Sequence, residues 1–208
     1  MSKGKLFIVS APSGCGKGTI LSEVFKERNV YYSVSATTRK PREGEINGTH
    51  YFFMSDDEFR KTISEDGFLE YASFAGNSYG TPKKAVFDKL EEGVDVVLEI
   101  ETQGAFQVKE KYPEAVMIFI LPPHIGELRR RLGKRGTESE EVIERRVSQA
   151  AGEIEKSLRY DYVIMNDDLE AAVKDFYTVI EAAGRGTHDA DAFKAENMKN
   201  TIKEVLEK

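Results

Sequence analysis

The chain has 208 residues, of which 40% are hydrophobic, so it can bury a substantial hydrophobic core. This length fits one domain of moderate size or a core domain with inserted lobes. A net charge of −6 argues against a general nucleic-acid-binding or membrane-surface protein. No apolar run approaches the roughly 18 residues of a membrane span, and no signal-peptide pattern opens the chain. A single cysteine excludes an intrachain disulfide. We therefore expect a cytoplasmic protein with no nucleic-acid or membrane partner.

The first predicted elements are a strand, a glycine-rich loop and a helix. An apolar run at residues 5–10 precedes the loop at 11–16, and helical spacing begins at Lys17. Glycines allow successive backbone N–H groups to point at one anion, and the N-terminus of the next helix adds partial positive charge. We expect Lys17 to reach the outer phosphates of a nucleoside triphosphate. A glycine-rich turn without a ligand is the alternative.

This loop departs from the pattern G-x-x-x-x-G-K-[ST] at two positions. Ala11 stands in place of the first glycine, which matters only if its backbone must be left-handed. Gly18 stands where a magnesium-binding hydroxyl is expected, and Thr19 lies about 100° further round the helix, so how magnesium is held stays open. Cys15, near a helix N-terminus and a lysine, is either a thiol of lowered pKa or a packed, inert one.

The next elements are short and form an insertion. Strands are predicted at 32–35 and 50–54, a helix at 55–65 behind a Ser55/Glu58 capping box, and a hairpin of strands at 68–75 and 78–80 around a Gly76-Asn77 turn. We therefore expect residues 36–84 to form an antiparallel insertion between core strands. Within it, Arg39 and Arg42 can converge on one small anion, because a guanidinium matches phosphate oxygens. The alternative is a solvated basic loop.

From residue 82 onward helices and strands alternate. Strands are predicted at 94–100, 115–121 and 162–165. Helices are predicted at 82–93, in the segment that ends before Pro113, at 127–158 and at 169–183. The helical region at 127–158 is interrupted at 133–136 and contains a Thr137/Glu140 capping box. Strands separated by helices predict an α/β fold with a parallel sheet flanked by helices and right-handed crossovers. We expect a core at about 1–35, 85–123 and 159–184, lobes at about 36–84 and 124–158, and a charged tail at 185–208 that ends in a weakly amphipathic helix.

Several motifs together resemble the guanylate kinase family. They are the segment from Ser35 to Tyr51, Phe68-Leu-Glu70, Gly76-Asn-Ser-Tyr79-Gly-Thr81, Glu99-Ile-Glu101-Thr-Gln-Gly104, and residues 135–140 and 166–169. The resemblance covers about residues 5–183. It implies a core like that of P-loop nucleoside monophosphate kinases, a GMP-binding lobe at 36–84 and a helical lid at 124–158. It also implies the reaction of ATP with GMP to give ADP and GDP, with Mg²⁺.

The resemblance assigns the acceptor side of the site. Around the GMP phosphate it places Ser35, Arg39, Arg42, Tyr51 and Tyr79, and around guanine it places Glu70 and Thr81. A carboxylate accepts from the guanine N1–H and 2-amino groups together, whereas adenine presents a bare nitrogen there. An exposed strand carboxylate is the alternative for Glu70. Of Glu99 and Glu101, one is expected to hold magnesium through water or to contact the GMP ribose, and their division of roles stays open.

The resemblance also assigns the donor side. Ser13, Gly14, Cys15, Gly16, Lys17, Gly18, Thr19 and Asn166 are expected to bind ATP, and Thr19 and Glu99 to contact Mg²⁺ directly or through water. Arg131, Arg135 and Arg146 are expected to stabilise the charge of the moving phosphoryl group together with Lys17 and Arg39. The nearby Arg129, Arg130, Lys134 and Arg145 are expected to be solvated. A turn-forming asparagine is the alternative for Asn166.

These observations predict in-line phosphoryl transfer from ATP to GMP, and to dGMP, in purine nucleotide metabolism. A GMP phosphate is largely anionic near neutral pH, so catalysis needs positioning and electrostatics rather than a strong base. Two other functions stay open. One is phosphoryl transfer to a different small acceptor. The other is a protein-interaction module of the same fold, although such modules typically lose the loop features that Gly14, Gly16 and Lys17 retain. Oligomeric state does not follow from the sequence.

Overall fold

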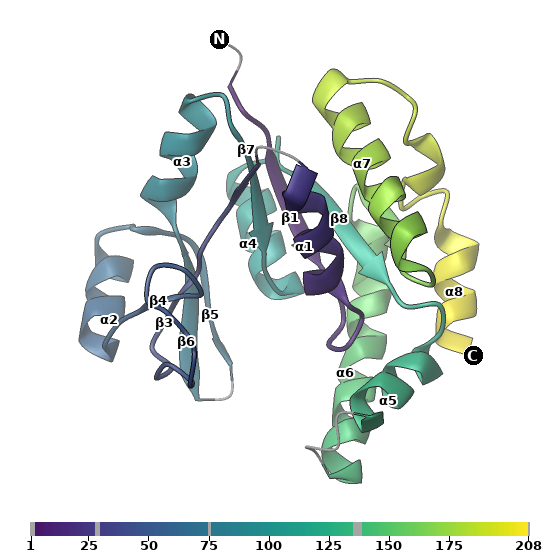
Figure 1. The fold of residues 1–208 in the computed structure, drawn as a ribbon, viewed down its shortest axis with the longest axis horizontal. Helices are drawn as coiled ribbons and strands as arrows, with labels where there is room; N and C mark the ends of the chain where they lie inside the picture. Colours follow the sequence, from purple (N-terminus) through teal and green to yellow (C-terminus); the bar gives the residue numbers. More distant parts are fainter. Residues whose placement is uncertain (1–2, 28–29, 75, 135–138, 208) are drawn as a thin grey trace. The chain divides into compact units, whose positions relative to one another are not determined.

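The computed structural model describes residues 3–27, 30–74, 76–134 and 139–207 (Figure 1). As predicted, the fold is α/β, with parallel strands and flanking helices. The chain divides into two compact units, with Met1–Ile8 and Asn29–Ala115 in unit 1 and Val9–Arg28 and Val116–Lys208 in unit 2. The boundary passes through β1 (Leu6–Ser10), whose five residues are all buried.

Unit 1 contains a parallel strand pair. β2 (Val30–Tyr32) pairs with β7 (Asp95–Glu99), and α3 (Lys83–Glu91) packs against β7 while α4 (Thr102–Lys111) follows it. The central three residues of β7 are buried, as is typical of a parallel strand covered on both faces. The predicted strand at 32–35 is shifted to Val30–Tyr32, because Val30 and Tyr31 favour a strand more strongly than the serines that follow.

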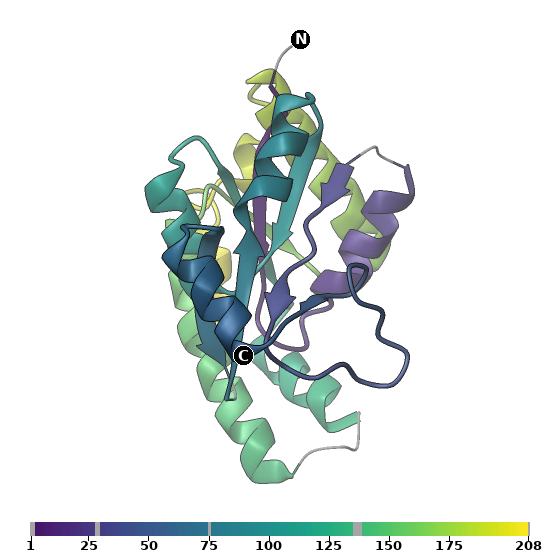
Figure 2. The same cartoon turned by 90° about the vertical axis from the view of Figure 1, so that its left-hand side faces the viewer.

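The insertion of unit 1 forms a second sheet, with the strand order β4 (Phe52–Phe53), β3 (Ala36–Thr37), β6 (Asn77–Pro82) and β5 (Phe68–Phe74). The β5–β6 hairpin is antiparallel as predicted, but β3 and β4 pair in parallel, so the sheet is mixed. Figure 2 shows α2 (Asp56–Ser64) beside these strands, where Phe59 packs on Phe68 with ring centroids 4.6 Å apart. The Ser55/Glu58 capping box that starts α2 is confirmed.

Unit 2 contains α1 (Lys17–Glu27) and the parallel pair β8 (Val116–Leu121) and β9 (Tyr162–Met165), the latter with the predicted bounds. α5 (Ile125–Lys134) and α6 (Glu140–Lys156) lie between these strands in the sequence and pack on each other. Ser139 caps α6, whereas the predicted cap residue Thr137 lies outside the described residues. α7 (Leu169–Arg185) packs on α1, where the Tyr177 hydroxyl donates to the Val24 carbonyl at 3.0 Å.

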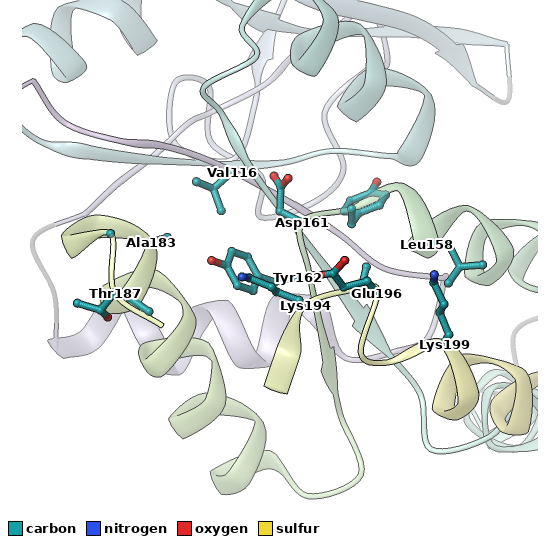
Figure 3. A pocket seen from close by; sticks show the side chains of 13 residues that line it. Val116, Leu158, Asp161, Tyr162, Ala183, Thr187, Lys194, Glu196 and Lys199 are labelled. Atoms are coloured by element: carbon teal, nitrogen blue, oxygen red, sulfur yellow. The ribbon is translucent and has the colours of Figure 1, made fainter. Parts of the chain in front are cut away.

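The tail is folded against the rest of unit 2. Gly186 ends α7 in a left-handed conformation, with φ of 67°. The chain then forms an isolated bridge from Lys194 to Tyr162 of β9 and passes through the short helix η2 (Asp191–Phe193). Between the tail and β9 lies a pocket of about 580 Å³, whose wall includes Tyr162, Thr187 and Lys194 (Figure 3). α8 (Lys199–Glu207) then packs on α5, α6 and the short helix η1 (Ser157–Arg159).

No helix in the described ranges combines the length and apolarity needed to cross a membrane.

The packing of α8 gives a stability prediction. Ile202 is 1% exposed, and Ile202→Ala should lower the free energy of unfolding by about 2–5 kcal/mol, because the change removes buried apolar surface and leaves a cavity. Urea denaturation measures the change. Lys203→Ala, at an exposed position of the same helix, is the matched control and should stay within about 0.5 kcal/mol. An unchanged unfolding midpoint for Ile202→Ala would contradict the docking of α8.

Candidate active site

The predicted site residues fall into two groups, one in each unit. The loop site, in unit 2, consists of residues 11–19 with Arg131 and Asn166. The lobe site, in unit 1, consists of Ser35, Arg39, Arg42, Tyr51, Glu70, Tyr79 and Thr81, with Glu99 and Glu101 at the end of β7.

The backbone of the loop site makes a tight turn between β1 and α1. Gly14 and Gly16 each have φ of 88°, which side-chain-bearing residues rarely adopt. The Cys15 N–H donates to the Pro12 carbonyl at 3.1 Å. Among the residues that the structure describes, the only non-glycine residue with positive φ is Asp66, so Ala11 is not left-handed. The missing first glycine of the motif therefore imposes no strain on this loop.

The carbonyl of Cys15 holds the turn in place. It accepts hydrogen bonds from Asn166 Nδ2 at 2.6 Å and from Arg131 Nη1 at 3.3 Å. A Cβ on Gly16 would lie 2.7 Å from Asn166 Nδ2, so this glycine is needed for space as well as for its backbone angle. Asn166 is buried, and its contact corresponds to the turn-organising alternative. Its role on the adenine side of ATP stays a prediction.

Arg131 is oriented by a residue that the sequence analysis missed. Glu127 of α5 accepts from Arg131 Nε at 2.7 Å and from Arg130 Nε at 2.6 Å. These hydrogen bonds lower the pKa of Glu127 to about 2, and the bond from Arg130 has the largest effect. Arg130 is therefore paired with Glu127, and its side chain is also 54% exposed, in line with the expected solvated side chain. The spacing of Glu127 three and four residues before the two arginines was the available signal.

Lys17 begins α1 and is half-buried, whereas Ser13, Gly18 and Thr19 are exposed. A Cβ placed on Gly18 would meet nothing within 4 Å, so the space where the motif normally carries a hydroxyl is open. The Thr19 N–H donates to the Gly16 carbonyl at 3.1 Å.

The other two predicted lid arginines are Arg135 and Arg146. Arg146 lies on α6 and is half-buried, and Arg135 lies outside the described residues.

The thiol of Cys15 is packed. Its side chain is 0% exposed, and Sγ–H donates to the Ile120 carbonyl at 3.4 Å. Burial raises the pKa of this thiol to about 12, although Arg131 and Lys17 act in the opposite direction. Of the two alternatives, the packed and inert thiol is the one that the structure supports.

In the lobe site Arg39 is fixed by a second carboxylate that the sequence analysis missed. The guanidinium of Arg39 donates to both carboxylate oxygens of Glu45, at 2.8 and 3.0 Å, and the Arg42 N–H donates to Glu45 at 2.7 Å. These hydrogen bonds lower the pKa of Glu45 to about 2, and the bond from Arg39 has the largest effect. The same guanidinium lies 5.3 Å from the ring centroid of Tyr51. Arg39 therefore has one fixed orientation.

Two phenols accompany Arg39. The rings of Tyr51 and Tyr79 meet edge to face with centroids 6.2 Å apart. Ser35 lies just before β3, and its carbonyl accepts from the Phe52 N–H at 2.9 Å. Arg42 has an exposed side chain. The structure thus brings Arg39, Tyr51 and Tyr79 together.

Glu70 is a buried carboxylate with a matched partner. It lies on β5 and is 5% exposed, and Oε1 accepts from the Thr81 hydroxyl on β6 at 2.7 Å. Burial raises the pKa of Glu70, and the Thr81 hydrogen bond opposes that shift. The alternative of an exposed strand carboxylate is therefore wrong.

The two glutamates after β7 differ in their surroundings. Glu99, the last residue of β7, accepts a hydrogen bond from the Tyr32 hydroxyl, and burial together with Glu99 raises the pKa of Tyr32. Glu101 is exposed and stands at the N-cap of α4 without a side-chain capping bond. Across the described ranges, no three His, Cys, Asp or Glu residues are grouped so that they could hold a metal.

Comparison with known proteins extends the sequence resemblance. Residues 3–183 match the family described as guanylate kinase. The curated guanylate kinases of Carboxydothermus hydrogenoformans and Clostridium tetani are 55% and 50% identical, over 88% of this chain and 90% and 88% of theirs. The crystal structure of guanylate kinase from Anaplasma phagocytophilum is 36% identical, with a TM-score of 0.72 over 88% of this chain and 87% of that one.

The packing of Cys15 predicts slow reaction with thiol reagents. With a pKa of about 12 and no exposed sulfur, the native protein should react with a chromogenic disulfide at least about a hundredfold more slowly than the urea-unfolded protein. Unfolded protein should give one thiol per chain, since Cys15 is the single cysteine. Rapid labelling of native protein that ATP prevents would show that Cys15 is reactive.

Proposed function

The chain belongs to the guanylate kinase family, and from this premise we propose that the loop site binds ATP and the lobe site binds GMP. The reaction is ATP-dependent phosphorylation of GMP to GDP. The observation that carries the assignment of the lobe site is Glu70, a buried carboxylate bonded to Thr81. Such a group needs donors, and guanine supplies two on one edge.

Guanine recognition follows from the acceptor capacity of Glu70. Thr81 occupies one position on Oε1 and leaves the carboxylate able to accept from guanine N1–H and the 2-amino group. Adenine offers no N1–H, so a bound adenine would leave a buried acceptor unpaired, which costs about 1–3 kcal/mol. The lobe site therefore selects guanine by a hydrogen-bond requirement rather than by shape alone.

The phosphate of GMP is assigned to Arg39, Arg42, Tyr51 and Tyr79, with Ser35 beside them. Glu45 holds Arg39 from one side, which leaves its remaining N–H donors preorganised for phosphate oxygens. The exposed side chain of Arg42 is the second cation in this group.

On the donor side, N–H groups of residues 13–18 other than that of Cys15, together with the N-terminus of α1, would bind the ATP phosphates. Lys17 would contact the outer phosphates, and Arg131, held by Glu127, would stabilise charge on the moving phosphoryl group. We assign Arg135 and Arg146 to the same task from the family resemblance, and Asn166 to the adenine side. The acceptor oxygen of GMP is already anionic, so these residues orient and stabilise rather than remove a proton.

Magnesium is the cofactor that the family implies. The Thr19 hydroxyl, exposed at the first turn of α1, and the Glu99 carboxylate are hard oxygen donors of the kind that Mg²⁺ prefers, so these residues fit the ion. From the family resemblance we assign each of them a contact with the ion, directly or through water. When bound, Mg²⁺ neutralises charge on the β- and γ-phosphates. The open space beside Gly18 has room for a water in place of the usual hydroxyl.

Within this function the lobes have distinct roles. We assign residues 36–84, with their own sheet and hydrophobic cluster, as the GMP-binding lobe, residues 124–158, with α5 and α6, as the lid, and the remainder up to 184 as the core. Lid closure would exclude water, which otherwise competes with GMP as the acceptor.

A coupled assay of ADP formation tests the proposal. Purified protein with ATP and Mg²⁺ should turn over with GMP, and dGMP, IMP, AMP and CMP should be compared as acceptors. Faster turnover with another acceptor would overturn the assignment of the lobe site to GMP. ATP binding in calorimetry without turnover of any acceptor would favour an interaction module.

Lys17→Ala should lower kcat by about a hundredfold or more, because the variant loses a positive charge that stabilises the transferred phosphoryl group. Steady-state kinetics with GMP and ATP measure the effect. Lys26→Ala is the matched control, since Lys26 lies at the other end of α1, 64% exposed and paired with Glu23. Turnover of Lys17→Ala close to that of the control would remove Lys17 from the site.

The preference for GMP over AMP should fall as the pH is lowered from neutral toward 4.5, the ordinary glutamate pKa. Burial raises the pKa of Glu70, so this carboxylate takes up a proton at a higher pH than an exposed one and then loses acceptor capacity. The ratio of kcat/KM for GMP to that for AMP measures the preference. Both nucleotides carry the same phosphate monoester, so the effect of phosphate ionisation cancels in this ratio.

Glu70→Gln should lower the same ratio at neutral pH by about 5- to 150-fold and flatten its pH dependence. Glu65→Gln, at an exposed glutamate of the same unit, is the control. A pH-independent preference in the unmodified protein would remove Glu70 from guanine recognition.

A further inference from the structure

Gly104 lies directly against the Glu70 carboxylate. It is a buried residue in the first turn of α4. A Cβ at this position would lie 2.5 Å from Glu70 Oε2, 3.0 Å from Cδ and 3.3 Å from Cγ, whereas ordinary contacts are 3.4–4 Å. No side chain therefore fits at residue 104 while Glu70 keeps its position.

The backbone does not explain this glycine. Gly104 is helical and is absent from the glycines with positive φ. In a helix alanine is favoured over glycine by about 1 kcal/mol. By contrast, Gly184 is also helical, in α7, and a Cβ there would meet nothing within 4 Å. The particular feature of residue 104 is the carboxylate beside it.

α4 cannot easily move away from Glu70, because two of its side chains hold it to β5. Lys111 Nζ donates to the Leu69 carbonyl at 2.9 Å, and Gln107 Nε2 donates to the Tyr71 carbonyl at 3.4 Å. These carbonyls belong to the residues on either side of Glu70. The hydrogen bonds from α4 to Leu69 and Tyr71 therefore determine how far Gly104 lies from the Glu70 carboxylate.

Both oxygens of Glu70 are thus constrained. Thr81 fixes Oε1 through a hydrogen bond of 2.7 Å, and the space left at Gly104 admits Oε2. We propose that Gly104 is a specificity-positioning residue, whose missing side chain lets the Glu70 carboxylate occupy the position from which it accepts both guanine donors. This inference rests on the proposed function of the lobe site.

A methyl group at residue 104 displaces that carboxylate. Restoring an ordinary contact requires a shift of roughly 1 Å, and a misplacement of that size at a site can cost about a hundredfold in rate. The two guanine hydrogen bonds lose alignment, whereas the proposed function assigns ATP to other residues, those of the loop site in unit 2. Gly104→Ala should therefore lower guanine selectivity and leave the KM for ATP unchanged.

The test is a double-mutant cycle on the ratio of kcat/KM for GMP to that for AMP. Gly104→Ala should lower this ratio by about 10- to 100-fold in the wild-type background. In the Glu70→Ala background the clash has no partner, and the same change should alter the ratio less than about twofold. Gly184→Ala is the matched control and should leave the ratio and the KM for ATP unchanged. Urea denaturation confirms that each variant is folded.

An unchanged ratio for Gly104→Ala, or an equal loss in both backgrounds, would overturn the proposal. If Gly104→Ala fails to fold, the Glu70→Ala/Gly104→Ala protein decides the question. A folded double variant supports the clash with the carboxylate, and an unfolded one overturns it. The outcome is separable from the proposed function. Wild-type protein that does not phosphorylate GMP contradicts that function, whereas wild-type selectivity retained by Gly104→Ala contradicts only the role of Gly104.

Discussion

The lobe site depends on a carboxylate that has lost most of its water. A buried glutamate is costly unless hydrogen-bond donors replace the solvent. Here the Thr81 hydroxyl supplies one donor, the absent side chain of Gly104 supplies space, and α4 packs against β5, which carries the carboxylate. Under the proposed function, the remaining acceptor capacity is directed at the paired N–H groups of guanine. In that proposal, base selectivity follows from the burial of a single side chain.

A related arrangement recurs in both units. Glu45 holds Arg39 in unit 1, and Glu127 holds Arg131 in unit 2, each through short charge-assisted hydrogen bonds. In both pairs a carboxylate orients an arginine that the proposed function assigns to a phosphoryl group. An arginine held in this way loses less conformational entropy when an anion binds.

The sequence could predict features that depend on local patterns. The capping box at Ser55, the hairpin of β5 and β6 and the bounds of β9 are of this kind, and the family resemblance supplied the candidate site. It could not predict the parallel pairing of β3 with β4 or the partner of Asn166, because these depend on contacts between distant segments. Gly104 was visible only as part of a motif. Its steric relation to Glu70, 34 positions earlier, needed coordinates.

The packing of Cys15 has a practical consequence for studying domain motion. The chain carries one cysteine, and its sulfur is buried. New cysteines introduced at exposed positions can therefore receive fluorophores or spin labels without replacing the native residue. Distance changes on addition of nucleotide can then be followed in a protein whose loop at residues 11–19 is unaltered.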